Sequence, residues 1–287
     1  MKNKTSLFLQ LIRFDKPAGT LLLALPCWFG IFLAGKHADN FSVFILLKML
    51  FLFTAGAFLM RSAGCVINDI FDRKIDAKVE RTKLRPLASG ELKLQEALIL
   101  LVVLLFAALL ILLCLNEYAI GAGFVALALA TLYPLMKRIT SYPQIFLGLA
   151  FNYGILMADL AINERLFVST MVLFAACVLW SLIYDSIYAF QDIEDDLKIG
   201  VKSSAIKFSD RPQQTLASLT AIMFAMIFVV GLMQGFSRYF YLFMMAAFLY
   251  ELFLIVKCDY SSPSLCLKAF KANVIVGLLI LVAIILG

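Results

Sequence analysis

Histidine, charged residues and paired cysteines are all scarce in this chain of 287 residues. The single histidine, His37, lies in a predicted short loop, where a surface role is more probable than metal binding. The six cysteines show no CxxC spacing and have no histidine nearby, so neither a zinc site nor a disulfide framework is indicated. Only 15% of the residues are charged, against about 25% in an ordinary soluble domain.

Apolar residues are correspondingly abundant, at 63% of the chain with a mean hydropathy of +0.96. This excess is too large for one buried core. A spanning helix needs about 20 mostly apolar residues. We therefore predict an all-α integral membrane protein, one polytopic domain over residues 1–287. Its nine transmembrane helices are expected near 18–36, 43–67, 95–114, 117–134, 143–161, 167–189, 214–234, 238–256 and 269–286.

The basic residues indicate how these helices are oriented. Links on the N-terminal side of the predicted membrane hold 20 of the 25 Lys and Arg residues, and the other side holds four. The positive-inside rule therefore places the N-terminus in the cytoplasm. This topology explains the net charge of +6 without a nucleic-acid partner. We expect no cleavable signal peptide, because Arg13, Asp15 and Lys16 precede the first long apolar run.

Two acidic clusters begin at the ends of predicted spans, on the same side of the membrane. The first acidic motif, residues 68–76, places Asn68, Asp72 and Asp76 at steps of four on one helical face, with Asp69 on the flank. Arg61 lies earlier on the same face, within reach of these carboxylates. Such ionisable groups near bilayer depth usually face a cavity and mark a functional site.

The second acidic motif, residues 185–196, repeats the pattern on the sixth predicted span. Asp185, Tyr188, Asp192 and then Asp196 or Asp195 step along one face of a continued helix. Carboxylate oxygens from two such motifs suit Mg²⁺ that carries a substrate phosphate. A single motif of this kind would most simply be a solvated acidic loop. Two copies, both at helix ends on the same side of the membrane, favour a functional site instead.

Basic residues on the same side offer contacts for a phosphate. Lys137 and Arg138 follow the fourth predicted span, and Lys202 follows the second acidic motif. Most of these residues serve as topological anchors. Arg138 and Lys202 are the preferred candidates for phosphate contacts, because a metal–phosphate site needs cations to offset leaving-group charge.

These motifs resemble those of the UbiA superfamily of intramembrane prenyltransferases. The run Asn68-Asp69-x-x-Asp72-x-x-x-Asp76 matches one family motif, and the run from Asp185 to Asp196, followed by Gly200, Lys202 and Ser203, matches the other. The resemblance covers about residues 10–210 and is nearest to the 4-hydroxybenzoate polyprenyltransferase branch. It includes the segments 13–19, 61–65, 85–90 and 133–144.

The resemblance implies nine helices around a central cavity that opens sideways to lipid, with both motifs on the cytoplasmic side. It implies Mg²⁺-dependent transfer of a polyprenyl chain from its diphosphate to 4-hydroxybenzoate, ortho to the hydroxyl, in ubiquinone biosynthesis. The bacterial inner membrane is the expected location, with the mitochondrial inner membrane as the alternative. The expected metal ligands are Asn68, Asp69, Asp72, Asp76, Asp192, Asp195 and Asp196.

Catalytic roles are expected for Asp72, Asp192 and Arg138. Substrate-binding roles are expected for Arg61, Asn68, Lys137, Arg138, Tyr188 and Lys202. Arg61 and Arg138 remain alternatives for the acceptor's carboxylate.

Two rival functions remain open. One is another enzyme of the same superfamily, acting on haem, a menaquinone precursor or chlorophyllide; the run Tyr188-Ala189-x-Gln191-Asp192 argues against it. The other is a divalent-cation transporter that uses carboxylates within the membrane. The acidic residues lie at helix ends on one side, which favours a one-sided active site.

Overall fold

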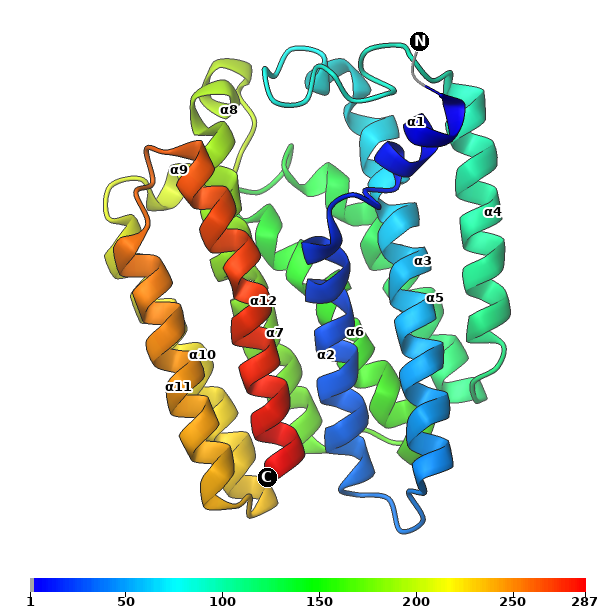
Figure 1. The fold of residues 1–287 in the computed structure, drawn as a ribbon, viewed down its shortest axis with the longest axis vertical. Helices are drawn as coiled ribbons and strands as arrows, with labels where there is room; N and C mark the ends of the chain where they lie inside the picture. The colour runs from blue at the N-terminus through cyan, green and yellow to red at the C-terminus, as the bar shows by residue number, and fades with distance from the viewer. Residues whose placement is uncertain (1–2) are drawn as a thin grey trace.

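A computed structural model describes residues 3–287, and within that range the chain is helical apart from its links, with no strand (Figure 1). The helices are α1 (Lys4–Leu11), α2 (Pro17–Gly35), α3 (Val43–Asp76), α4 (Leu94–Leu112), α5 (Glu117–Met136), α6 (Pro143–Asn163), α7 (Val168–Ala189), the 3₁₀ turn η1 (Phe190–Asp192), α8 (Ile193–Ile199), α9 (Ser204–Phe208), α10 (Pro212–Gln234), α11 (Arg238–Lys257) and α12 (Pro263–Leu286).

Nine helices in the described residues have the length and composition to cross a membrane, which confirms the predicted fold class. Most bounds lie close to the expected ranges. α12 begins earlier than expected, at Pro263, because its first turns are too polar to register in an apolar window; proline is well suited to this first helical position. The short helix α1 was not predicted, since it lies outside any apolar run.

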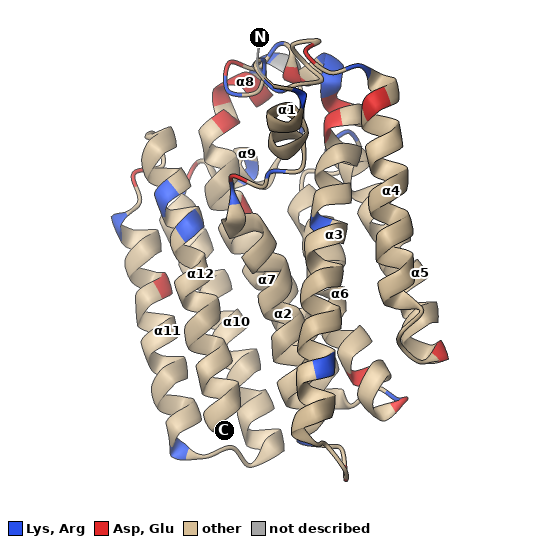
Figure 2. Cartoon of the chain, turned by 45° about the vertical axis from the view of Figure 1, so that its right-hand side comes forward, with Lys and Arg blue, Asp and Glu red and all other residues tan. Residues whose placement is uncertain are grey.

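The two ends of the bundle differ in charge. The N-terminus lies at the same end as α8 and the link after α3, and the C-terminus lies at the opposite end (Figure 1). Acidic and basic residues gather at the N-terminal end, while the shafts of the helices are almost free of them (Figure 2). Both acidic motifs therefore lie at one end of the bundle, as their spacing along the chain predicted.

α7 is the central helix, and α4 lies at the periphery. In the most apolar stretch, 67% of the span that starts with α7 is buried, compared with 11% for α4. Trp180 and Tyr184 of α7 are fully enclosed and pack edge to face, with ring centroids 5.4 Å apart. The second acidic motif therefore continues from the most firmly packed helix of the protein.

Small residues allow α6 to pack closely against both α2 and α7. A Cβ atom added at Gly30 of α2 would lie 2.7 Å from the Cα of Ile155, and one at Gly148 of α6 would lie 2.9 Å from the carbonyl oxygen of Val178. Such approaches are typical of helix pairs in membranes, where packing contributes much of the association energy. They hold α6 closely between α2 and α7.

Two polar residues of α6 serve structural roles. Asn152 bonds a neighbouring helix: its Nδ2 donates to the carbonyl of Cys177 and to Ser181 Oγ on α7, at 3.0 and 2.8 Å. Asp159, near the far end of the same span, is fully buried. It accepts bonds from the Phe167 backbone N–H and Asn163 Nδ2, both at 2.8 Å, so it closes the turn into α7.

Candidate active site

The first acidic motif forms the last two turns of α3, which runs without a break to Asp76. Asp69, Asp72 and Asp76 are all buried, and each is neutralised by a cation from another segment. Arg13 Nη2 donates to both oxygens of Asp69, at 2.8 and 2.9 Å. Arg85 Nη1 bridges Asp69 and Asp76, at 3.1 and 2.7 Å. These contacts fasten the N-terminal segment and the link 77–93 to the motif.

Asp72 occupies a different environment from its neighbours. Its Oδ2 accepts a bond from Lys137 Nζ, at the end of α5. Its Oδ1 is buried and has no hydrogen-bond partner among the described residues. Arg61, expected near these carboxylates, does not pair with them, since Arg13, Arg85 and Lys137 take the acidic positions.

The second acidic motif was predicted as one continuous helix, and this is wrong beyond Ala189. There α7 gives way to the 3₁₀ turn η1, and α8 follows. Phe190 is buried against Tyr260, with ring centroids 4.8 Å apart. Gln191 Nε2 donates to the Tyr188 carbonyl at 2.8 Å, which satisfies an oxygen that loses its regular partner at a helix end. These contacts accompany the turn, so the residues from Asp192 to Asp196 do not continue the regular helix of α7.

Arg81 joins the two motifs. It lies in the link that follows the first motif, and its guanidinium binds both carboxylate oxygens of Asp192. Its Nη1 also donates to the hydroxyl of Tyr188 at 2.8 Å. Burial opposes the charge of Arg81, but its hydrogen bond with Asp192 and the nearby acidic groups outweigh that effect and raise its pKa above the ordinary value. Arg81 therefore stays charged and holds the motifs together.

A cavity of about 1360 Å³ opens beside the motifs. Near the motifs, polar side chains from four segments line it. Its remaining walls are apolar and come mainly from α2, α3, α4, α5, α6 and α12. The polar lining includes Arg13, Lys16, Arg61, Asn68, Asp69, Arg81, Arg85, Asp185 and Tyr188.

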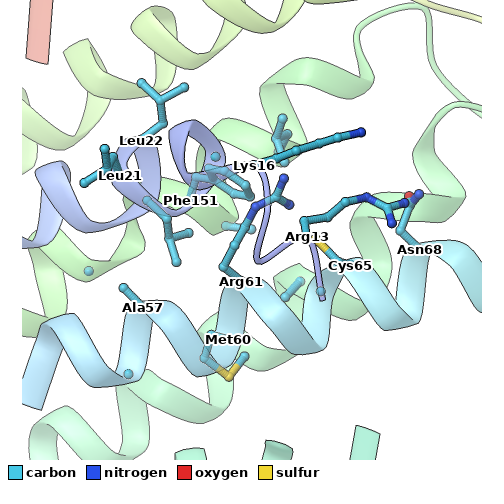
Figure 3. A pocket seen from close by; sticks show the side chains of 18 of the residues that line it. Arg13, Lys16, Leu21, Leu22, Ala57, Met60, Arg61, Cys65, Asn68 and Phe151 are labelled. Carbon is cyan, nitrogen blue, oxygen red and sulfur yellow. The ribbon is translucent and has the colours of Figure 1, made fainter. Parts of the chain in front are cut away.

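Arg61 is a cation of this wall that makes no ion pair with a motif carboxylate among the described residues. Figure 3 shows its side chain rising from α3 toward Phe151 and the segment that carries Lys16. The guanidinium lies 5.5 Å from the centroid of the Phe151 ring. A Cβ atom added at Gly19 would come within 2.6 Å of it. The absence of a side chain at Gly19 thus makes room for the guanidinium. Burial and the charge of Arg13 lower the pKa of neighbouring Lys16.

The structure brings only part of the predicted site into the cavity wall. Arg61, Asn68, Asp69 and Tyr188 line the cavity. Asp72, Asp76 and Asp192 lie at the motif end, within ion pairs. Three other predicted residues lie farther out. Lys202 Nζ donates to the Ile139 carbonyl at 3.1 Å, and Asp195 lies 3.8 Å from Lys198. Arg138 is exposed, and its side chain makes no hydrogen bond or ion pair with another described residue.

Sequence reasoning did not anticipate the ion-pair partners. Arg13 and Arg85 were noted as basic residues on the same side of the membrane and as parts of matching segments, but nothing in their spacing linked them to Asp69. Asp185 was noted as the start of the second motif but was given no role. The spacing of Asp185 could have indicated a separate role, because two helical turns separate it from Asp192, the next carboxylate along the chain.

The donor set suits a hard divalent cation. The carboxylates and the Asn68 amide offer oxygen ligands of the kind Mg²⁺ prefers. Asp72 Oδ1 is a buried acceptor with no partner, which is costly unless a donor or cation meets it. Among the described residues no group of three or more His, Cys, Asp or Glu side chains is already gathered for a metal. Lys and Arg side chains hold the carboxylates apart instead.

The amino-acid sequence of the chain is similar to sequences of known proteins. The model of the UbiA prenyltransferase family matches residues 23–280. The chain is 44% identical to 4-hydroxybenzoate octaprenyltransferase of Histophilus somni, over all of this chain and 98% of that protein. It is 43% identical to mitochondrial 4-hydroxybenzoate polyprenyltransferase of Schizosaccharomyces pombe, over 96% of this chain and 78% of that one.

A solved structure has the same fold. The UbiA homolog from Archaeoglobus fulgidus, bound to GPP and Mg²⁺, superposes with a TM-score of 0.73. The alignment covers 97% of this chain and 99% of that one, at 22% sequence identity. At this identity the likeness concerns the fold.

Proposed function

Because this chain belongs to the UbiA prenyltransferase family, we propose that it transfers a polyprenyl chain from its diphosphate to the ring of 4-hydroxybenzoate, ortho to the hydroxyl, in ubiquinone biosynthesis. Relatives that carry this name are 43–44% identical to it over nearly its whole length. The observation that carries the proposal is the cavity, which joins a highly charged end to a long apolar interior. A polyprenyl diphosphate has the same division.

The diphosphate of the donor binds at the motif end. Mg²⁺ bound there would be held by Asn68, Asp69, Asp72, Asp76, Asp192, Asp195 and Asp196, and it would supply positive charge to the phosphate oxygens. The protein contributes Arg13, Arg81, Arg85 and Lys137, each paired with a motif carboxylate. These four cations lie at the motif end and bind the diphosphate. They then stabilise the charge that develops on the leaving group.

The acceptor's carboxylate binds Arg61. Arg61 lines the cavity, carries no carboxylate partner among the described residues, and lies over an aromatic ring. Arg138, the competing candidate, is exposed at the end of α5, outside the cavity. An Arg guanidinium matches the planar fork of a carboxylate, which orients the phenol ring toward the reacting carbon of the donor.

The chain's residues then promote breaking of the allylic C–O bond. The electron pair of that bond leaves on the diphosphate oxygen, where the bound cations stabilise it. The ortho carbon of the ring attacks the allylic carbon, and the new C–C bond forms. The apolar walls contributed by α3, α4 and α5 hold the prenyl tail and keep water from the cation.

One assay tests the function. Purified protein in phospholipid vesicles is supplied with Mg²⁺, a prenyl diphosphate and 4-hydroxybenzoate, and the product is identified by mass and by the position of substitution. We expect 3-prenyl-4-hydroxybenzoate, and no product when a chelator replaces Mg²⁺. The same protein offered haem or a menaquinone precursor should yield nothing. Prenylation of one of those acceptors alone would overturn the assignment, and Mg²⁺ flux without product would favour a transporter.

Two variants test the acceptor site. Arg61→Lys keeps the charge but removes the fork, and Gly19→Ala places a methyl group against the guanidinium. Both should raise the KM for 4-hydroxybenzoate about tenfold or more, with the KM for the donor nearly unchanged. An equal rise in both KM values would move Arg61 to the diphosphate site.

We also propose that the chain lies in the bacterial cytoplasmic membrane with the motif end facing the cytoplasm. The unequal distribution of basic residues supports this orientation. Ser89 and Ser209 are exposed at the motif end and can each be replaced by a single cysteine in a background without the native cysteines. An impermeant reagent should reach both cysteines in inverted vesicles and neither in intact cells. Labelling in intact cells would reverse the topology.

A further inference from the structure

The proposed reaction leaves one proton without an acceptor. When the ring forms its bond to the allylic carbon, the substituted ring carbon carries both the prenyl group and its original hydrogen. Aromaticity returns only when that hydrogen leaves as a proton and its bonding pair stays in the ring. The diphosphate leaves at the other end of the allylic carbon and is surrounded by cations. A side chain of the cavity wall beside the ring is the group we expect to accept the proton, because the apolar walls and the prenyl tail limit the access of water to the ring.

Few groups in the wall can do so. Among the described residues that line the cavity there is no histidine and no glutamate, and the carboxylates are Asp15, Asp69 and Asp185. Asp69 is engaged by Arg13 and Arg85 through three short contacts. Asp15 is exposed at the rim of the cavity, in the segment before α2. Among the described residues, Asp185 is the less exposed of the two wall carboxylates that make no ion pair or hydrogen bond, the other being Asp15.

The position of Asp185 separates it from the metal chemistry. It lies in α7, seven residues before Asp192, which corresponds to about 10 Å along a helix. That distance places it below the motif end, beside the aromatic and apolar part of the wall. It is half-buried, and its neighbours Tyr184 and Tyr188 line the same cavity. Asp185 is therefore available to a group bound deeper than the diphosphate.

The charges around Asp185 suit a base that acts on the acceptor. Arg61 of α3 and Arg81 of the link 77–93 are the cations that act on its carboxylate. Tyr133 of α5, Tyr184 of α7 and Lys271 of α12 line the same cavity, and the two phenols lie within electrostatic range of Asp185. Because Arg61 is the proposed partner of the acceptor's carboxylate, a ring held by Arg61 lies beside Asp185.

We infer that Asp185 is a catalytic residue, the general base that accepts the proton lost by the ring of the aromatic acid. This rests on the proposed function of the cavity. The carboxylate takes the hydrogen from the substituted carbon as a proton, the C–H electron pair restores the aromatic ring, and the neutral Asp185 later releases the proton to solvent when the product leaves. No oxidant or further reactant takes part.

The test compares Asp185→Asn and Asp185→Glu with the wild type in the prenylation assay described above. The Asn variant keeps the size of the side chain but cannot accept the proton, so kcat should fall about 100-fold or more. The Glu variant should recover a substantial part of that loss. The KM for the prenyl diphosphate should stay within about twofold in both. Asp15→Asn, at the rim of the same cavity, is the matched control and should retain wild-type kcat.

Deuterium at the ring positions ortho to the hydroxyl gives a readout that a structural role would not change. In the wild type, removal of the ring proton is fast and the isotope effect on kcat should be near one. In Asp185→Asn this step becomes limiting, and the effect should rise to about two or more. The acid limb of the pH–kcat profile should also disappear in this variant.

Three results would overturn the inference. They are wild-type kcat in Asp185→Asn, an impaired Asn variant without an isotope effect, and loss of donor binding in both Asp185 variants. The last would place Asp185 in the diphosphate site or the fold. Absence of product from the wild type would instead contradict the proposed function, so the two failures are distinguishable.

Discussion

The two acidic motifs share a chemical composition but differ in how the fold holds them. The first is the end of an unbroken helix, and Asp69, Asp72 and Asp76 are buried in it with fixed cationic partners. The second crosses a 3₁₀ turn into the short helix α8, and Asp192, Asp195 and Asp196 are only partly enclosed. One motif is thus part of a continuous, buried helix, and the other is a broken helix that is only partly buried.

Arg81 connects the two motifs across the cavity. Among the described residues, Arg81–Asp192 is the only ion pair between the link 77–93 and the second acidic motif. The same guanidinium reaches Tyr188, which contacts Phe270 of α12 at a centroid distance of 4.7 Å. Cations from the protein thus pair with the acidic groups of both motifs and offset the repulsion between them.

The largest effect is expected from the central carboxylate of each motif. Asp72→Asn and Asp192→Asn preserve shape but remove a negative charge, so each should reduce kcat at least 100-fold. The thermal unfolding midpoint should change by only a few degrees, since each loses one ion pair. Product formation and unfolding are measured on the same preparations. Near-normal turnover in both variants would remove these residues from the metal site.

Replacement of Lys137 should weaken donor binding more than replacement of its neighbour Arg138. Lys137 pairs with Asp72, whereas Arg138 is exposed beside it. Lys137→Ala should raise the KM for the donor about tenfold, because a charge-assisted contact to the diphosphate is lost. Arg138→Ala should stay within about twofold of the wild type, and Arg138→Lys closer still. A larger defect in Arg138→Ala would restore the phosphate role that the sequence favoured.

The mildest expected change lies at the end of α8. Gly200 has a φ of +77°, a conformation that costs other residues about 1 kcal/mol. Gly200→Ala should therefore loosen the second motif and lower kcat/KM for the donor about fivefold. Gly200→Asn, which tolerates this conformation better, should be less impaired. Equal activity in all three proteins would show that the geometry of α8 does not limit donor binding.

The sequence predicted the structure of the first acidic motif better than that of the second. Steps of four from Asn68 to Asp76 describe a helix, and α3 has that form because local propensity and packing agree. No proline or glycine marks the break after Ala189, which depends on Phe190 meeting Tyr260 far along the chain. The pairing of Arg13 and Arg85 with Asp69 is likewise a long-range contact that residue spacing cannot reveal. Composition indicated the membrane spans, since apolar length alone largely decides them.

The central claim is that the two motifs form a single donor site. A double-mutant cycle on Mg²⁺-dependent donor binding tests it most directly. Binding of a non-hydrolysable prenyl diphosphate analogue is measured calorimetrically in the wild type, Asp72→Asn, Asp192→Asn and the double variant, with and without Mg²⁺. We predict that each single substitution removes most of the Mg²⁺-dependent affinity and that the double variant is hardly weaker than either, which means strong coupling. Losses that simply add, or metal-dependent binding that survives in either single variant, would contradict the account.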